Sequence, residues 1–206
     1  MVHTQLRARG IDDAAVLRAM GAVPRERFVL EADVAMAYAD CPLSIGHGAT
    51  ISQPYIVALM TALAQVKRGD RVLDVGTGSG YQAAVLAELG AEVFGIELVD
   101  ALTAFASRCL EKAGYTVDVR TGDGHGGRPE HAPYAAIVCA AAAEEVPAAL
   151  VEQLAVGGRL VIPIGGAWRD ATLKVVTRTE DGPTVADTIG VRFVPLRHPD
   201  HSLSSK

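Results

Sequence analysis

The stretch that decides the fold is Val72-Leu73-Asp74-Val75-Gly76-Thr77-Gly78-Ser79-Gly80-Tyr81-Gln82. Its pattern predicts a buried strand, a glycine-rich turn and the start of a helix, because an apolar run continues to Leu89. Glycines let a ligand approach bare backbone, and a helix N-terminus offers unpaired N–H groups. The stretch therefore predicts that a nucleotide-like ligand lies at the end of this strand.

The spacing of the glycines narrows the class of ligand. A dinucleotide fingerprint would place its third glycine at position 81, where this chain has Tyr81. No Gly-Lys-Ser/Thr follows, which disfavours a Walker loop. Glu97 ends the next strand-like run, where its carboxylate could accept hydrogen bonds from both hydroxyls of a ribose. The loop alone could be a plain structural turn, but the loop and Glu97 together favour an adenosine-containing cofactor.

Strand-like and helix-like runs alternate after the loop. Strands interleaved with helices favour parallel pairing through right-handed crossovers. Two further alternating runs, joined by Glu180-Asp181-Gly182-Pro183, predict an antiparallel hairpin. We therefore predict an α/β fold with a doubly wound, mostly parallel seven-stranded sheet that ends in a C-terminal antiparallel hairpin. The predicted strands are 72–75, 92–97, 116–120, 134–139, 158–163, 171–179 and 184–194, and the predicted helices are 79–89, 100–113 and 146–155.

The first 66 residues predict a helical cap on this core. Apolar spacing indicates a helix over 4–20, an irregular segment over 38–52, and a helix over 54–66 with Pro54 in its first turn. Ser52 would then lie at a helix N-terminus, either as an ordinary helix cap or as a donor to an anion.

Bulk properties exclude several classes of protein. The net charge is -5 with no basic stripe, which disfavours a nucleic-acid partner. Cys41, Cys109 and Cys139 are odd in number and far apart, which indicates reduced thiols in the cytoplasm. His125 and His131 have no cluster of further ligands around them in sequence, so we expect solvated side chains and no metal. No apolar run approaches membrane-spanning length, and we expect no membrane contact, a cytoplasmic protein and a monomer.

Asp123-Gly124 follows the third predicted strand. Ligands of doubly wound sheets bind at the carboxyl ends of the strands, where the glycine loop, Glu97 and Asp123 all fall. The Asp123 carboxylate could accept from an adenine amino group; the alternative is a simple Asp-Gly turn.

Several stretches together resemble the protein-L-isoaspartate O-methyltransferase family. The most specific is Thr50-Ile51-Ser52-Gln53-Pro54, which general methyltransferases of this fold lack. The others extend the resemblance over about residues 23 to 196. They are 23–29 (Val-Pro-Arg-Glu-Arg-Phe-Val), 45–55, 76–82, 122–124, 157–160 and 192–196 (Arg-Phe-Val-Pro-Leu).

The resemblance implies a Rossmann-like methyltransferase fold in one domain. It also implies methyl transfer from S-adenosyl-L-methionine to the α-carboxylate of L-isoaspartyl residues in flexible peptide segments, which leaves S-adenosyl-L-homocysteine and starts repair through a succinimide. The parts would be an N-terminal cap with a substrate segment (1–66), a cofactor-binding core (67–166) and a hairpin with tail (167–206). Ser52 matches the active-site serine. The implied cofactor residues are Asp74, Gly76, Thr77, Gly78, Ser79, Gly80, Glu97, Asp123 and Gly124, and the implied substrate residues are Thr50, Ile51, Ser52, Gln53, Arg192, Val194, Pro195 and Leu196.

Two positions depart from the family pattern. Ala135 replaces a common aspartate, and Cys139 replaces a usual threonine or glycine, both near the expected site. Cys139 is either a small core residue, which we favour, or a thiol near the methyl donor. The alternatives are therefore a methyltransferase of the same fold with another carboxylate acceptor, such as a modified peptide or a small molecule, and a non-catalytic module that binds S-adenosylmethionine.

Overall fold

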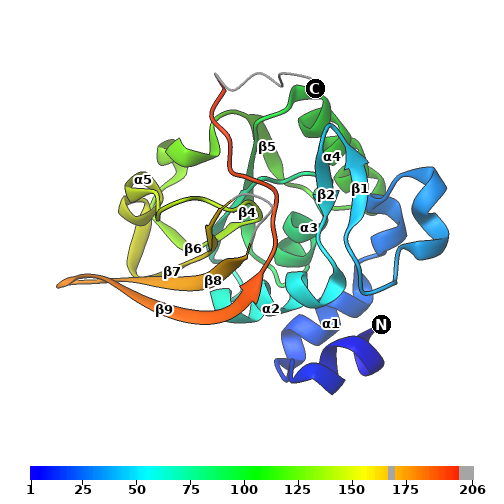
Figure 1. Cartoon of the computed structure of the whole chain (residues 1–206), viewed down its shortest axis with the longest axis horizontal. Helices are drawn as coiled ribbons and strands as arrows, with labels where there is room; N and C mark the ends of the chain where they lie inside the picture. Colours follow the sequence, from blue (N-terminus) through cyan, green and yellow to red (C-terminus); the bar gives the residue numbers. More distant parts are fainter. Residues whose placement is uncertain (167–169, 200–206) are drawn as a thin grey trace.

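A computed structural model describes residues 1–166 and 170–199. Its main sheet has seven strands in the order β5-β4-β3-β6-β7-β8-β9 (Figure 1). The first five of these pair in parallel, and β7, β8 and β9 pair antiparallel. The predicted fold class is therefore confirmed. The strands are β3 Arg71–Val75, β4 Glu92–Glu97, β5 Asp118–Thr121, β6 Tyr134–Cys139, β7 Leu154–Gly165, β8 Ala171–Thr179 and β9 Gly182–Val191.

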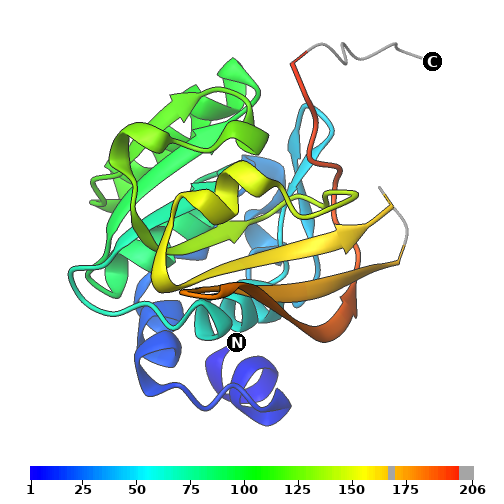
Figure 2. The same ribbon diagram turned by 90° about the vertical axis from the view of Figure 1, so that its left-hand side faces the viewer.

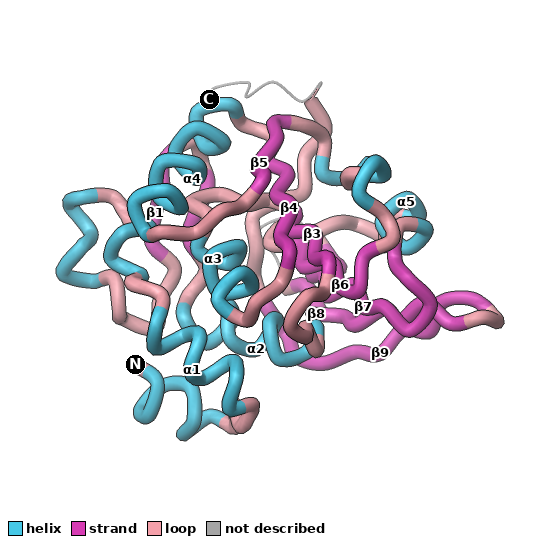
Figure 3. The backbone as a smooth tube through the Cα atoms, turned by 180° about the vertical axis from the view of Figure 1, so that it is seen from behind, coloured by secondary structure: helices cyan, strands magenta, loops and turns pink. Residues whose placement is uncertain are grey.

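Helices cover both faces of the sheet, because alternate side chains of each strand point to opposite faces. Val72 belongs to the apolar cluster with α1, α2, α3 and α4, whereas Leu73 belongs to the cluster with α5. Figure 3 shows α2, α3 and α4 together on one side of the strands and α5 on the other. The helices are α1 Ala14–Ala22, α2 Pro54–Ala64, α3 Tyr81–Glu88, α4 Asp100–Ala113 and α5 Ala148–Glu152.

The strand order places the switch point of the sheet between β3 and β6. The chain moves outward from β3 to β4 and β5, then returns to the other side of β3 with β6. Crevices for ligands form at the carboxyl ends of the strands at such a point. Here Gly76 follows β3 and Ala140 follows β6, so the glycine loop lies at this crevice.

The N-terminal cap is helical but broken. One continuous helix over 4–20 was wrong: short helical turns η1 Val2–Leu6 and η2 Arg7–Arg9 end at Gly10, whose φ is +87°. The Asp13 carboxylate then accepts from the amides of Ala15 and Val16 and starts α1. Two more short helical turns of the cap are η3 Arg25–Phe28 and η4 Glu31–Met36. Two others lie between β5 and β6, η5 Gly124–Gly126 and η6 Pro129–His131.

The segment predicted to be irregular, 38–52, contains a β-hairpin. Strand β1 Leu43–Gly46 pairs antiparallel with β2 Ala49–Ile51. The two residues between them, His47 and Gly48, both have positive φ, as a tight two-residue hairpin turn requires. His-Gly is a weaker turn signal than Asn-Gly, and the strands are short, so the sequence pattern did not reveal them.

The chain leaves the sheet earlier than predicted, because β9 ends at Val191 rather than at 194. We call residues 192–199 the C-terminal strap. Figures 1 and 2 show it running beside the β1–β2 hairpin. Two backbone hydrogen bonds hold it: the Ala142 amide donates to the Val194 carbonyl, and the Leu196 amide donates to the Ala142 carbonyl. Within residues 1–166 and 170–199, no helix is both long and apolar enough to cross a membrane.

Candidate active site

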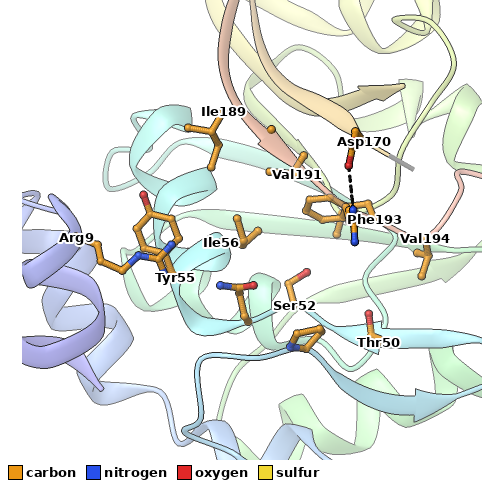
Figure 4. Close-up of a pocket in the computed structure, with 15 residues that line it drawn as sticks. Arg9, Thr50, Ser52, Tyr55, Ile56, Asp170, Ile189, Val191, Phe193 and Val194 are labelled. Atoms are coloured by element: carbon orange, nitrogen blue, oxygen red, sulfur yellow. Dashed lines mark hydrogen bonds and ion pairs between the residues drawn. The ribbon is translucent and has the colours of Figure 1, made fainter. Parts of the chain in front are cut away.

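Two hollows meet at the carboxyl edge of β3 and β6. The glycine-loop cavity, about 280 Å³, is lined by the loop, the end of β4 and the C-terminal strap. The Ser52 cleft, about 560 Å³, is lined by the segment before α2 and by residues 189–194 (Figure 4). Thr50, Ala140 and Val194 line both. The two hollows are therefore neighbours that share these three residues as a common border.

The glycine loop presents backbone to its cavity. Gly76 and Gly78 line the cavity, and both have positive φ. Gly80 lies behind them with φ +89°, and a Cβ there would lie 3.0 Å from Leu110 Cγ of α4. The loop therefore closes against α4 only because position 80 has no side chain.

Glu97 lies at the wall of the glycine-loop cavity. It is 8% exposed and lines the glycine-loop cavity. Its two carboxylate oxygens accept from the amides of Gly78, at 2.9 Å, and Val99, at 3.0 Å. These bonds fix the carboxylate and leave lone pairs for further donors, as its predicted ribose contact needs.

Three further residues predicted to bind the cofactor do not line the glycine-loop cavity. Thr77 and Ser79 are buried, and Asp74 is fully buried with no hydrogen-bond partner for either carboxyl oxygen among the described residues. Burial raises the pKa of Asp74 to about 7.

Asp123 is also outside the lining of the cavity, although Gly124 belongs to it. The Asp123 carboxylate contacts Nδ1 of His125 and Nδ1 of His198, each at 2.9 Å, and the two rings stack at 3.7 Å. Partial burial raises the pKa of Asp123, but hydrogen bonds from the His125 amide first, and then from the two rings, outweigh it and the net shift is downward. The contact pins the end of the C-terminal strap. The adenine contact stays a prediction.

The two histidines differ from expectation in this region. His125 packs against His198, and His131 stacks on the Phe94 ring at 4.0 Å, so neither ring is simply solvated. The polar end of the chain begins with His198, whose ring contacts the Asp123 carboxylate. Its remainder, residues 200–206, lies outside the described part of the chain.

Ser52 is free for a ligand because another residue caps α2. The N-cap position is Gln53, which makes no side-chain cap bond, and the Tyr55 amide donates instead to the Asp40 carboxylate at 3.0 Å. The Ser52 hydroxyl makes no hydrogen bond within residues 1–166 and 170–199. Figure 4 shows it in the cleft, across from Phe193. The helix-cap interpretation of Ser52 is therefore wrong.

The predicted substrate residues divide between the two hollows. Gln53, Arg192 and Val194 join Ser52 and Thr50 in the Ser52 cleft. Ile51, the last residue of β2, is buried and lines neither hollow. Pro195 and Leu196 line the glycine-loop cavity instead, because the C-terminal strap crosses from one hollow to the other.

Neither departure from the family pattern borders the site. Ala135 is the second residue of β6, whereas the site lies at the end of that strand, past Cys139. Four residues of strand span about 13 Å. Cys139 is fully buried, its thiol donates to the Ala141 carbonyl, and burial raises its pKa to about 12. The core interpretation of Cys139 is confirmed, and the expectation that Ala135 borders the site was wrong.

Two arginines could not be found from the sequence: Arg9, which lines the Ser52 cleft, and Arg25, which contacts the Ser52 backbone without lining the cleft. Arg9 lies over the Tyr55 ring, with its guanidinium 3.5 Å from the ring centroid, and pairs with Asp40 at 2.5 Å. Arg25 is fully buried and donates to the Ser52 carbonyl. These contacts join segments 27 to 46 residues apart, and no local pattern signals them. The only hint was that Arg25 belongs to one of the stretches quoted above.

Known proteins share both the sequence and the fold. The chain matches the family described as Protein-L-isoaspartate(D-aspartate) O-methyltransferase (PCMT) over residues 1–200. It is 54% identical over 197 residues to a protein-L-isoaspartate O-methyltransferase of Gloeobacter violaceus, covering 95% of this chain and 96% of that protein. It is 55% identical to the protein of the same name from Opitutus terrae, covering 95% and 84%.

A solved structure supports the same assignment. The fold matches a chain from Plasmodium falciparum, described as a β-aspartate methyltransferase (PCMT), with a TM-score of 0.83 and 30% identity over 95% of this chain and 96% of that one. That structure is a complex with S-adenosyl-L-homocysteine. This chain belongs to the protein-L-isoaspartate (D-aspartate) O-methyltransferase family.

Proposed function

We propose that this protein transfers the methyl group of S-adenosyl-L-methionine to the free α-carboxylate of L-isoaspartyl residues in flexible polypeptide segments. The observation that carries the proposal is the meeting of two hollows at Thr50, Ala140 and Val194, with the glycine loop on one side and Ser52 on the other. Methyl transfer needs such a junction, because donor and acceptor must be held in contact and in line.

The residues of the glycine-loop cavity fit the cofactor. Gly76 and Gly78 offer backbone that a nucleoside can approach, and Glu97 holds a fixed carboxylate with free lone pairs at the wall. When bound, S-adenosylmethionine supplies an electrophilic methyl group on a sulfonium. The C-terminal strap covers the cavity from the opposite side with Pro195 and Leu196.

The protein's own task is to bind, align and exclude water. An α-carboxyl group has a pKa of about 3.5 and is already ionised at neutral pH, so no general base is required. The Ser52 hydroxyl, which has no partner within residues 1–166 and 170–199, can donate to one oxygen of the carboxylate. Alignment of this kind can contribute about 7 to 11 kcal/mol in favourable cases. The backbone amide nitrogen can then attack the resulting methyl ester and close a succinimide as methanol leaves, and hydrolysis of the succinimide returns part of the residue to aspartate.

The structure removes the reason for expecting a different methyl acceptor. A different carboxylate substrate was suggested by Ala135 and Cys139, but Ala135 lies at the far end of β6 and Cys139 is in the core. The test below would detect both alternatives: methylation of another carboxylate, and cofactor binding without methylation.

Matched peptides test the proposal. The protein is incubated with methyl-labelled S-adenosylmethionine and two peptides that differ only in isoaspartate or aspartate at one position. We expect label in the isoaspartyl peptide alone. Equal labelling of both peptides, or of neither while the cofactor binds, would contradict the proposal.

We also propose a monomer that acts in the cytoplasm on peptide and protein substrates and binds neither nucleic acid nor membranes. The free thiols of Cys41, Cys109 and Cys139 support a reducing compartment. Size-exclusion chromatography with light scattering tests the oligomeric state, and a mass above one chain would contradict it.

A further inference from the structure

Arg25 contacts three separate segments of the chain, one of which carries Ser52, while remaining hidden from solvent. It is fully buried in η3. Its Nε donates to the Ala37 carbonyl at 2.7 Å, and its Nη2 donates to the Ser52 carbonyl at 2.8 Å. Its guanidinium carbon lies 4.7 Å from the centroid of the Tyr81 ring. Tyr81 is the first residue of α3, directly after the glycine loop. Arg25 therefore fixes the peptide of Ser52 relative to the donor side of the site.

The charge of Arg25 is not neutralised by a bonded carboxylate. No carboxylate of the described residues lies within ion-pair distance of its guanidinium, and Nη1 is buried without a hydrogen-bond partner among them. The nearby Asp40 pairs with Arg9, and Glu26 accepts from the Tyr38 hydroxyl on the exposed side. Burial lowers the pKa of Arg25, yet a guanidinium remains charged at neutral pH. A cation thus lies directly behind the Ser52 peptide.

A buried, unpaired cation costs folding free energy, so its retention calls for a use. A neutral side chain could bridge two carbonyls equally well. A positive charge adds attraction for an anion, and that attraction is strong where water is excluded. The Ser52 cleft is where the acceptor carboxylate binds if the function proposed above holds.

We propose that Arg25 is a positioning residue that selects the acceptor carboxylate: it orients Ser52 through the backbone and supplies the positive charge behind it. Arg25 does not line the Ser52 cleft, so it acts through Ser52 rather than by touching substrate. This inference rests on the proposed function, since it assigns the charge preference of the same cleft.

Binding to the complex with S-adenosyl-L-homocysteine separates this role from a structural one. We would measure dissociation constants for two peptides, one with an isoaspartyl α-carboxylate and one with the neutral α-carboxamide, by calorimetry on wild type, Arg25→Met and Arg25→Lys. Arg27→Met is the matched control, because Arg27 belongs to the same turn, is exposed and, among the described residues, donates a side-chain hydrogen bond only to the Lys112 carbonyl. Binding of S-adenosyl-L-homocysteine and the melting temperature report on the fold.

We expect wild type to prefer the carboxylate by at least about tenfold, and Arg25→Met to lose most of that preference, while cofactor affinity changes less than about twofold. Arg25→Lys should keep the preference but bind both peptides about tenfold more weakly, because lysine cannot bridge two carbonyls in the same fork. An unchanged preference in Arg25→Met would overturn the inference. If that variant does not fold, Arg25→Lys decides: unchanged affinity or lost preference would overturn it. No preference in wild type would contradict the proposed function itself, which the methylation of matched peptides tests separately.

Discussion

The glycine-loop cavity and the Ser52 cleft differ in how the chain builds them. Gly76 and Gly78 follow β3 directly, and Glu97 ends the neighbouring strand, so two adjacent strands supply the essential wall of the cavity. The Ser52 cleft draws on the N-terminal turns, the segment before α2 and the chain after Thr188. The cofactor side is thus part of the sheet itself, whereas the acceptor side is assembled on it from distant segments.

This difference predicts that changes on the acceptor side affect turnover without affecting the cofactor. Ser52→Ala removes a hydrogen bond to a charged group and should lower kcat/KM for an isoaspartyl peptide by about 100-fold. The measurement is the initial rate of methyl transfer, with Ser44→Ala as a control on the exposed face of the hairpin. A loss of less than about threefold would remove Ser52 from the reaction.

The two glycine turns should respond unequally to the same change. Gly80→Ala forces a side chain into a left-handed conformation and against Leu110, and should cost about 3 kcal/mol of unfolding free energy. Gly48→Ala, in the hairpin turn, has φ +71° but open space around it, and should cost about 1 kcal/mol. Urea unfolding measures both. Equal costs would show that the donor side is no more tightly built than the acceptor side.

Buried Asp74, near the end of β3 on the cofactor side, should make the stability of the fold depend on pH. Its pKa is raised from an ordinary value of 3.8 to about 7, so the folded state binds more protons than the unfolded state between these values. The free energy of unfolding is therefore higher at low pH, where Asp74 is protonated in the folded state. It falls by about 2 kcal/mol between pH 5.5 and 8, as the pH rises through the folded-state pKa of about 7. Asp74→Asn should lack this slope in urea unfolding without cofactor. The same slope in wild type and variant would contradict the assignment.

How far the sequence alone predicts this protein follows the same division. The glycine loop, Glu97 and the seven strands could be predicted, since strand periodicity and turn residues are local signals. The β1–β2 hairpin, the capping of α2 by Asp40 and the contact of Arg25 with Ser52 could not, because each depends on tertiary contacts between separate segments. The position of Ala135 was a different kind of miss: it is the second residue of the predicted strand 134–139, and ligands of such sheets bind at the carboxyl ends, so the sequence already placed it away from the site.

The smallest expected effect concerns the contact of His198 with Asp123 and His125, at the end of the C-terminal strap. His198→Ala removes the contact with Asp123 and the stacking on His125, but the hydrogen bonds of Ala142 still hold the strap. We expect S-adenosyl-L-homocysteine to bind about three- to fivefold more weakly, as one exposed hydrogen bond allows. Calorimetry checks this against His3→Ala, a change at an exposed histidine of the N-terminal turn. Equal affinities in the two variants would show that the His198 contact has no effect on cofactor binding.

The separation of the two sides can be measured with one ligand and two variants. Calorimetric titration of S-adenosyl-L-homocysteine into Glu97→Ala should show affinity weakened by about 50-fold, because a charged acceptor of ribose hydroxyls is lost along with the bond that fixes Gly78. The same titration into Ser52→Ala should give the wild-type dissociation constant within about twofold, since Ser52 lines the other hollow. Comparable weakening in both variants, or wild-type affinity in Glu97→Ala, would contradict the division into a cofactor side and an acceptor side.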